Sequence, residues 1–156
     1  MSTTRGKVIL AAVLGALGLP AAGARAMDCQ GAPTSARLVI TVENVSESKG
    51  LMTATLYGAD RNTFLVRNGA LKVWRTAARA PTTNMCAWLP APGAYAVAIY
   101  HDANSNMKFD IGPLGPTEAF GFSNNPRILF SKPSYESARF IAHAGDNTLH
   151  IHLRQP

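Results

Sequence analysis

The stretch GAYAVAIY, residues 93–100, decides the fold class. Successive side chains of an extended chain point to opposite faces, so Tyr95, Val97 and Ile99 share one face and three alanines share the other. Apolar residues on both faces are typical of a strand buried on both sides. We therefore expect this stretch to be the central strand of a β-sheet.

Shorter runs of alternating or β-branched residues predict further strands on both sides of this one. These runs are residues 37–43, 51–57, 71–75, 83–89, 137–143 and 147–153. Turn residues join the first two runs and also the last two, which predicts two hairpins. We expect an all-β fold, an antiparallel β-sandwich of about seven strands, with no long helix in the domain.

The N-terminus has the pattern of a secretory signal. Arg5 and Lys7 precede an apolar run, and two overlapping A-x-A cleavage patterns end at Ala26. The run is too short to span a membrane, and no second apolar stretch of that length follows it. We expect a signal peptide at residues 1–26, a mature N-terminal segment at 27–36 and the β-sandwich domain at 37–156, exported to the periplasm or the medium.

The charge of the mature chain excludes one class of partner. The whole chain has a net charge of +6, and cleavage after Ala26 leaves 12 basic and 9 acidic residues. The basic residues are scattered singly, without the clusters that nucleic-acid binding requires. We therefore expect no nucleic-acid partner.

Cys29 and Cys86 are the only cysteines. An even number of cysteines in an exported chain favours a disulfide over two free thiols. Such a bond would attach the mature N-terminal segment to a strand. The spacing excludes a C-x-x-C redox motif.

A long polar segment, residues 101–125, follows the central strand. Connections of this length are uncommon, and they are usually functional or disordered. Oxygen-bearing side chains recur at Asp102, Asn104, Asn106 and Asp110, the spacing of a calcium loop, in which the carbonyl of Lys108 would supply a further ligand.

Two departures weaken the match to a calcium loop. Met107 stands where the motif has glycine, and Pro113 stands where it has a bidentate glutamate. Two hypotheses stay open. The loop is a weak calcium site with Glu118 as a substitute carboxylate, or its side chains cap backbone N–H groups in Asx-turns without metal.

Three motifs surround this loop: G-A-Y-A-V at residues 93–97, H-D-x-N-x-N at 101–106 and P-x-E-A-F-G-F-S-N-N at 116–125. On these motifs the chain resembles the DUF2141 family of uncharacterised exported bacterial proteins, over residues 37–153. The resemblance implies export and an immunoglobulin-like or transthyretin-like β-sandwich, but no reaction. The matching positions are Tyr95, His101, Asp102, Asn104, Asn106, Lys108, Asp110, Glu118, Gly121, Phe122, Ser123, Asn124 and Asn125. Met107 departs from the family's usual glycine.

Two functions follow as hypotheses. The first is a non-enzymatic exported module that presents a loop surface to an unidentified protein or carbohydrate. That surface would consist of His101, Glu118, Ser123, Asn124 and Asn125. The alternative is an enzyme that uses His101, Asp102 and Glu118 as acid and base groups in a loop-lined cleft.

A separate group of imidazoles, His143, His150 and His152, lies in the expected C-terminal hairpin. These side chains are either a zinc or copper site or ordinary solvent-facing positions, and the second reading is favoured.

Overall fold

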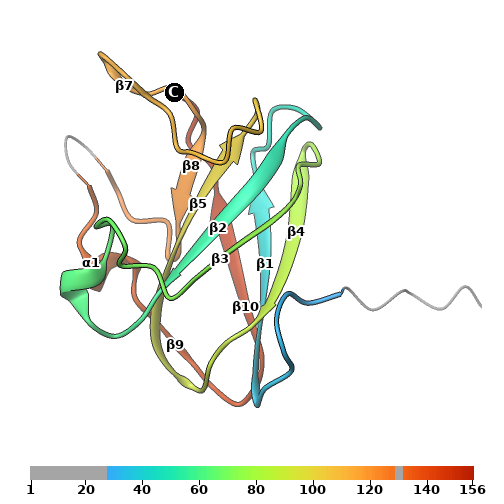
Figure 1. Cartoon of the computed structure of the whole chain (residues 1–156), viewed down its shortest axis with the longest axis vertical. Coiled ribbons are helices and arrows are strands. Elements are labelled where there is room, and N and C mark those ends of the chain that lie inside the picture. The colour runs from blue at the N-terminus through green and yellow to red at the C-terminus, as the bar shows by residue number, and fades with distance from the viewer. Residues whose placement is uncertain (1–27, 129–131) are drawn as a thin grey trace, which may run out of the picture.

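The computed structural model describes residues 28–128 and 132–156 and has two packed β-sheets (Figure 1). One sheet has the strand order β10-β1-β4, and the other has the order β3-β2-β5-β8, with β9 paired to the start of β5. The expected all-β sandwich is confirmed. The expected signal peptide, residues 1–26, lies outside the described residues. The elements are β1 (Ala36–Glu43), β2 (Leu51–Tyr57), the 3-10 helix η1 (Arg61–Thr63), β3 (Lys72–Ala77), β4 (Thr82–Trp88), β5 (Gly93–Asp102), β6 (Ile111–Gly112), β7 (Gly115–Pro116), β8 (Phe120–Phe122), α1 (Tyr135–Ala138), β9 (Phe140–Ala142) and β10 (Gly145–His152).

Strand β5 is central and covered on both faces, as its sequence predicts. Val97 and Ile99 point into the main core between the sheets. Ala96 and Ala98 face a second apolar cluster that contains Phe122. The small alanine side chains leave room for aromatic rings on this outer face, so one strand supports two cores.

The two sheets approach each other closely where β8 meets β10. A Cβ atom at Gly121 would lie 2.7 Å from Ile151 Cγ2 and 2.9 Å from the carbonyl oxygen of His152. Only glycine fits at this contact, since the nearest obstacles include backbone.

The prediction of two hairpins is wrong, because neither pair of strands forms one. Strand β1 pairs with β10 and β4, whereas β2 pairs with β3 and β5 in the other sheet. The C-terminal strands also separate, because β9 pairs with β5 and β10 pairs in parallel with β1. The sandwich is therefore not purely antiparallel. Residues 135–138, expected in part as strand, form the short helix α1, whose first turn is capped by Ser134.

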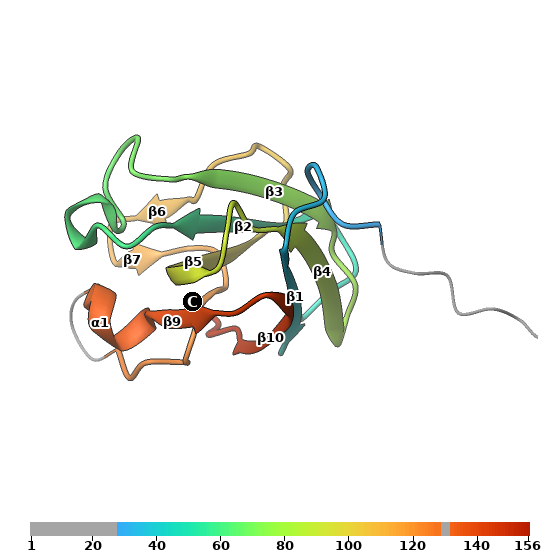
Figure 2. The same ribbon diagram turned by 90° about the horizontal axis from the view of Figure 1, so that it is seen from below.

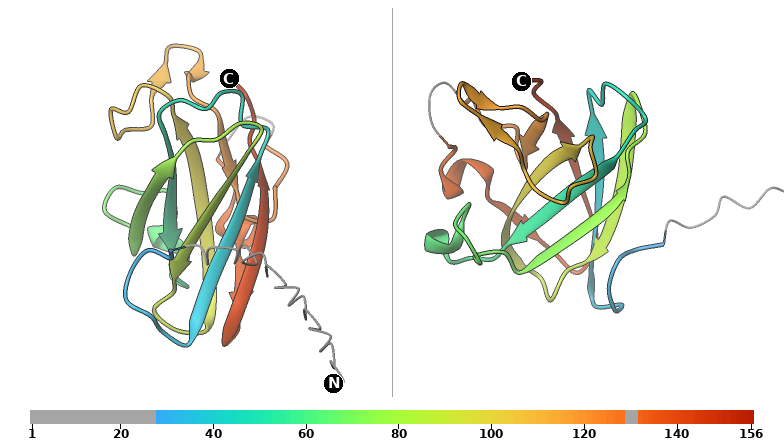
Figure 3. Two further views of the ribbon diagram at one scale, coloured as in Figure 1. Left: turned by 90° about the vertical axis from the view of Figure 1, so that its right-hand side faces the viewer. Right: turned by 45° about the horizontal axis from the view of Figure 1, so that its top comes forward.

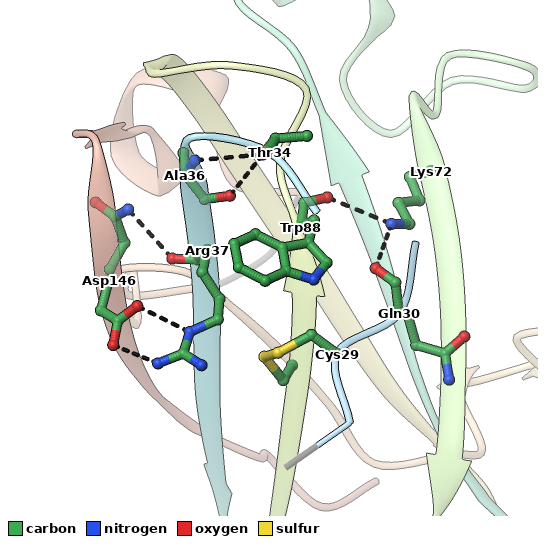
Figure 4. Close-up of a disulfide and its surroundings, with 10 residues drawn as sticks. Cys29, Gln30, Thr34, Ala36, Arg37, Lys72, Trp88 and Asp146 are labelled. Carbon is green, nitrogen blue, oxygen red and sulfur yellow. Dashed lines mark hydrogen bonds and ion pairs between the residues drawn. A yellow bond between two sulfur atoms is a disulfide. The ribbon is translucent and has the colours of Figure 1, made fainter. Parts of the chain in front are cut away.

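The expected disulfide is present and joins Cys29 to Cys86 in β4 (Figure 4). Beside it, Gln30 donates its backbone N–H to the carbonyl of Cys86 at 3.0 Å and accepts the N–H of Trp88 at 3.1 Å. Lys72 Nζ, from the edge of the other sheet, donates to the carbonyl of Gln30 at 2.7 Å. Gln30 is thus held against both sheets.

Helices in the described part of the chain are short, and none has the length and apolar character needed to cross a membrane.

Candidate functional site

The long connection after β5 lies at one end of the sandwich. It contains β6 and β7, which pair as a small hairpin. Figures 1 and 3 show this hairpin standing beyond the ends of the long strands. We call residues 102–110, which lead into the hairpin, the Asx loop.

Side-chain oxygens curl the Asx loop around Asp102. This carboxylate is fully buried, and its two oxygens accept the backbone N–H groups of Asn106 at 3.0 Å and Met107 at 2.8 Å. Asn104 Oδ1 also accepts the N–H of Asn106 at 3.0 Å, and Asn106 Oδ1 accepts the N–H of Lys108 at 2.8 Å. The contacts of Asn104 and Asn106, each to the N–H two residues on, are Asx-turns, one of the two arrangements expected from the spacing. Asp102 reaches further, to the N–H groups four and five residues on.

Asp110 closes the loop from its far end. Its Oδ2 atom accepts from the amide groups of Asn104 at 2.9 Å and Asn106 at 2.8 Å. Its backbone N–H donates to Glu118 Oε2 at 3.0 Å. The side chains of the proposed metal set therefore lie together, and they are bonded to one another and to the backbone.

Glu118 is the unusual group of this cluster. The side chain is buried, and its Oε1 atom has no hydrogen-bond partner within the described ranges. Burial raises the pKa of the Glu118 carboxyl; the N–H bond from Asp110 lowers it, and the nearby carboxylates of Asp110 and Asp102 raise it further. An ionised Glu118 is therefore costly in this fold.

His101 is buried on the other side of the strand end. Its Nε2 atom lies 2.7 Å from the carbonyl oxygen of Lys49, so Nε2 carries a proton and donates it. The neighbouring Gly50 has a φ of 71°, and a Cβ atom there would lie 2.1 Å from the carbonyl oxygen of Asp102. The turn after β1 thus packs tightly against the start of the Asx loop.

Ser123 and Asn124 fasten β8 to its neighbours. Ser123 is fully buried; its Oγ atom accepts the N–H of Val97 at 2.9 Å and donates to the carbonyl of Ala138. Asn124 Nδ2 donates to the carbonyl of Arg139 at 2.6 Å. The structure therefore places His101, Glu118 and Ser123 in the interior and not on a loop surface.

Asn125 binds the edge of β10. Its side-chain amide donates to the carbonyl of His150 at 2.9 Å and accepts the N–H of His152 at 2.8 Å. Asn124 and Asn125 both have positive φ values, 64° and 48°, a conformation that asparagine tolerates better than most residues. The S-N-N motif thus joins β8 to both sheets.

A comparison with known families now identifies the chain. Residues 40–150 match the model of a family described as an uncharacterised protein conserved in bacteria, DUF2141. The chain belongs to the DUF2141 family. The resemblance seen in the sequence motifs is confirmed. No curated protein and no solved structure matches the chain.

In this DUF2141 protein the matched residues contain the whole Asx loop and its hydrogen-bond partners, but not Cys29. The disulfide therefore attaches a segment outside the matched residues to the family domain.

The imidazoles of the DUF2141 domain do not form a metal site. His150 Nδ1 and His152 Nδ1 each lie 3.1 Å from an oxygen of Glu43 on the exposed face of β1. The backbone N–H of His143 donates to Asn147 Oδ1 at 2.8 Å. Within residues 28–128 and 132–156, no group of three His, Cys, Asp or Glu side chains is placed to hold a metal ion.

Met107 stores strain in the Asx loop. Its φ is 62° and its side chain is 62% exposed. The left-handed backbone is unfavourable for a residue with a Cβ atom, and little burial of the side chain offsets this energy. We expect Met107→Gly to raise the free energy of unfolding by about 0.5–1 kcal/mol, as measured by urea unfolding.

Lys108→Gly is the matched control for Met107→Gly, because the backbone of Lys108 is not left-handed. This control should lower the free energy of unfolding by a similar amount. A loss of stability in both variants would contradict the prediction that the backbone of Met107 is strained.

The raised pKa of Glu118 predicts a pH-dependent effect. A carboxyl whose pKa is raised by folding adds stability below its unfolded pKa, and this stability is lost as pH rises through the folded value. We therefore expect Glu118→Gln, which is neutral at all pH values, to be more stable than the wild type at neutral pH. The difference should shrink as the pH falls toward the ordinary pKa of glutamic acid.

Urea unfolding over a pH series measures the effect of Glu118→Gln. Glu47→Gln, at an exposed position between β1 and β2, controls for the removal of one negative charge. If Glu118→Gln were less stable than the wild type at neutral pH, the ionised carboxylate would have to be stabilised by a bound cation or another donor.

Proposed function

We propose that this DUF2141 protein is an exported, non-enzymatic binding module whose Asx loop holds a surface in fixed shape for a partner. The observation that carries the proposal is the pair of N–H groups, from Asn106 and Met107, bound by the two oxygens of buried Asp102. A loop fixed in this way presents the adjoining hairpin β6–β7 at little cost in conformational entropy when a partner binds.

Two observations support export. The disulfide between Cys29 and Cys86 is of a kind that persists in oxidising compartments. Residues 1–26 carry the charged and apolar regions of a secretory signal. N-terminal sequencing of the chain from a bacterial periplasm should begin at Met27. A full-length chain recovered from the cytoplasm would contradict this part of the proposal.

Two of the three acid and base groups of the enzyme alternative, His101 and Asp102, have structural partners. Both oxygens of Asp102 bind backbone N–H groups, and the His101 ring donates to the carbonyl of Lys49. His101 is 3% exposed and Asp102 is 0% exposed. A general base needs access to the proton that it removes, so these positions support the non-enzymatic proposal.

Weak calcium binding is a second candidate function. The unpartnered Oε1 atom of Glu118, in a cluster with Asp102 and Asp110, favours it. An oxygen that accepts one N–H also keeps a lone pair for a cation. Against it, the amide groups of Asn104 and Asn106 already donate to Asp110. The described residues also contain no group of three His, Cys, Asp or Glu side chains placed to hold a metal ion. The dissociation constant of such a site would be roughly 10⁻⁴–10⁻³ M.

A thermal melt separates the two candidates. We expect the same midpoint in excess EDTA and in millimolar calcium, because the Asx loop supplies its own donors. A midpoint that rises with calcium but not with magnesium would favour the calcium site, since a ligand stabilises only the state that it binds. The rise should then disappear in Asp110→Ala, whereas Asp60→Ala, at the cap of η1, should keep it.

A further inference from the structure

An apolar groove of about 740 Å³ lies beside the hairpin β6–β7. This volume falls within the range of small-molecule sites, roughly 300–1,000 Å³. Figure 2 shows that β6, β7 and α1 lie on the side of the molecule away from β1 and β4. The residues that line the groove include Leu65, Val66, Ile111, Leu114, Phe120 and Lys132.

Aromatic rings give the groove a fixed floor. The centroid of Phe120 lies 5.8 Å from that of Phe109 and 5.9 Å from that of Phe122, both in edge-to-face contact. Phe122 also contacts Phe64 at 6.4 Å, and Phe64 belongs to the second apolar cluster. Rings packed in this way lose little freedom when a ligand binds them.

The walls are apolar side chains that the fold leaves exposed. Val66 is 50% exposed, Ile111 is 69% exposed and Leu114 is fully exposed. Single exposed apolar residues need no explanation. Several around one groove form a contiguous patch, which is typical of a binding site.

One charged side chain stands at this groove. Among the described residues that line the groove, Lys132 is the only charged one. Its Nζ atom donates to the carbonyl of Leu65 at 3.4 Å, and the ion pairs found in the described residues do not include it. An ammonium group has three donors, so Lys132 has donors to offer a ligand. An apolar groove with one cation at its edge complements a ligand with one apolar chain and one anionic group.

We propose that this groove binds a free long-chain fatty acid. The alkyl chain lies over Phe120 and against Val66 and Ile111, and the carboxylate binds Lys132. Burial of the chain supplies most of the affinity, in proportion to the apolar area removed from water. The inference deepens the proposed function and rests on it, since it names the partner of the surface that the Asx loop supports.

Binding of cis-parinaric acid, a naturally fluorescent fatty acid, tests the apolar part of the site. We expect a saturable rise in fluorescence below the concentration at which the probe aggregates. The double variant Val66→Asn, Ile111→Asn should weaken binding by about tenfold or more. Leu71→Asn, at a position 57% exposed and outside the groove, should bind as the wild type does. Absence of saturable binding, or equal loss in the control, would overturn the inference.

Competition by oleate and by oleyl alcohol tests the charged part. Lys132→Gln should weaken the binding of oleate by about fivefold and leave the binding of the neutral alcohol unchanged. Lys49→Gln, which removes an exposed cation elsewhere, should change neither. An equal effect of Lys132→Gln on both competitors would overturn the assignment of the carboxylate.

Two further outcomes separate this inference from the proposed function. A dimer in analytical ultracentrifugation that the double variant disperses would assign the groove to a second copy of the chain, which overturns the fatty-acid inference alone. Failure to bind the probe, while the amides of the Asx loop are protected from hydrogen exchange, would also overturn the fatty-acid inference alone. If the amides of the Asx loop were not protected in the wild type, the proposed function itself would be overturned.

Discussion

Replacing Asp102 with alanine is expected to lower the free energy of unfolding by about 3 kcal/mol. The carboxylate is fully buried and binds the backbone N–H groups of Asn106 and Met107. A hydrogen bond to a charged group contributes about 1.5–3 kcal/mol, and the variant leaves both donors without this acceptor. Linear extrapolation of urea unfolding measures the change.

Two matched variants sharpen the Asp102 experiment. Asp102→Asn keeps one acceptor oxygen and should lose about half as much stability as the alanine variant. Asp110→Ala removes a carboxylate that, among the described residues, accepts only from side-chain amides, so it should lower the free energy of unfolding by about 1 kcal/mol. A loss in Asp102→Ala no larger than that in Asp110→Ala would show that Asp102 does not hold the loop.

Reduction of the disulfide is expected to lower the free energy of unfolding by about 4 kcal/mol. The bond joins residues 57 positions apart. In the chain-entropy model a crosslink of this span lowers the conformational entropy of the unfolded chain, which stabilises the folded state by about that free energy. We expect the two backbone bonds of Gln30 to β4 to remain after reduction. The effect should therefore fall mainly on the unfolded chain.

Urea unfolding with and without a thiol reductant measures the contribution of the disulfide. The double variant Cys29→Ser, Cys86→Ala is the control. It should be insensitive to the reductant and should match the reduced wild type in stability, because Cys86 is buried and alanine leaves no polar group there. Equal midpoints for the oxidised and reduced wild type would contradict the prediction.

The longer strands were predictable from the sequence, but their pairing was not, and neither were β6, β7 and β8, which lie in the segment 101–125 that was expected to be a loop. Alternation along β1 and β5 reports which side chains are buried, and this is a local property. The partner of a strand depends on contacts between distant segments. The parallel pairing of β1 with β10 is one example. The contact that only Gly121 permits between β8 and β10 is another.

The same distinction applies to the candidate site. The bonds from side-chain oxygens to backbone N–H groups in the Asx loop span two to five residues, so the spacing of Asp102, Asn104 and Asn106 was enough to predict such capping as one of two arrangements. The bond from His101 to Lys49, 52 residues away, has no local signal. The apolar groove was missed because Val66, Ile111 and Lys132 come together only in the folded chain.

Amide hydrogen exchange at Asn106 and Met107, measured by NMR in excess EDTA, tests most directly whether the Asx loop is held by its own side chains. Exchange reports local opening of a hydrogen bond. We expect both amides to exchange at least about tenfold more slowly than in an unfolded peptide, and calcium to leave these rates unchanged. Unprotected exchange in EDTA, with protection appearing only after calcium is added, would contradict a self-supported loop.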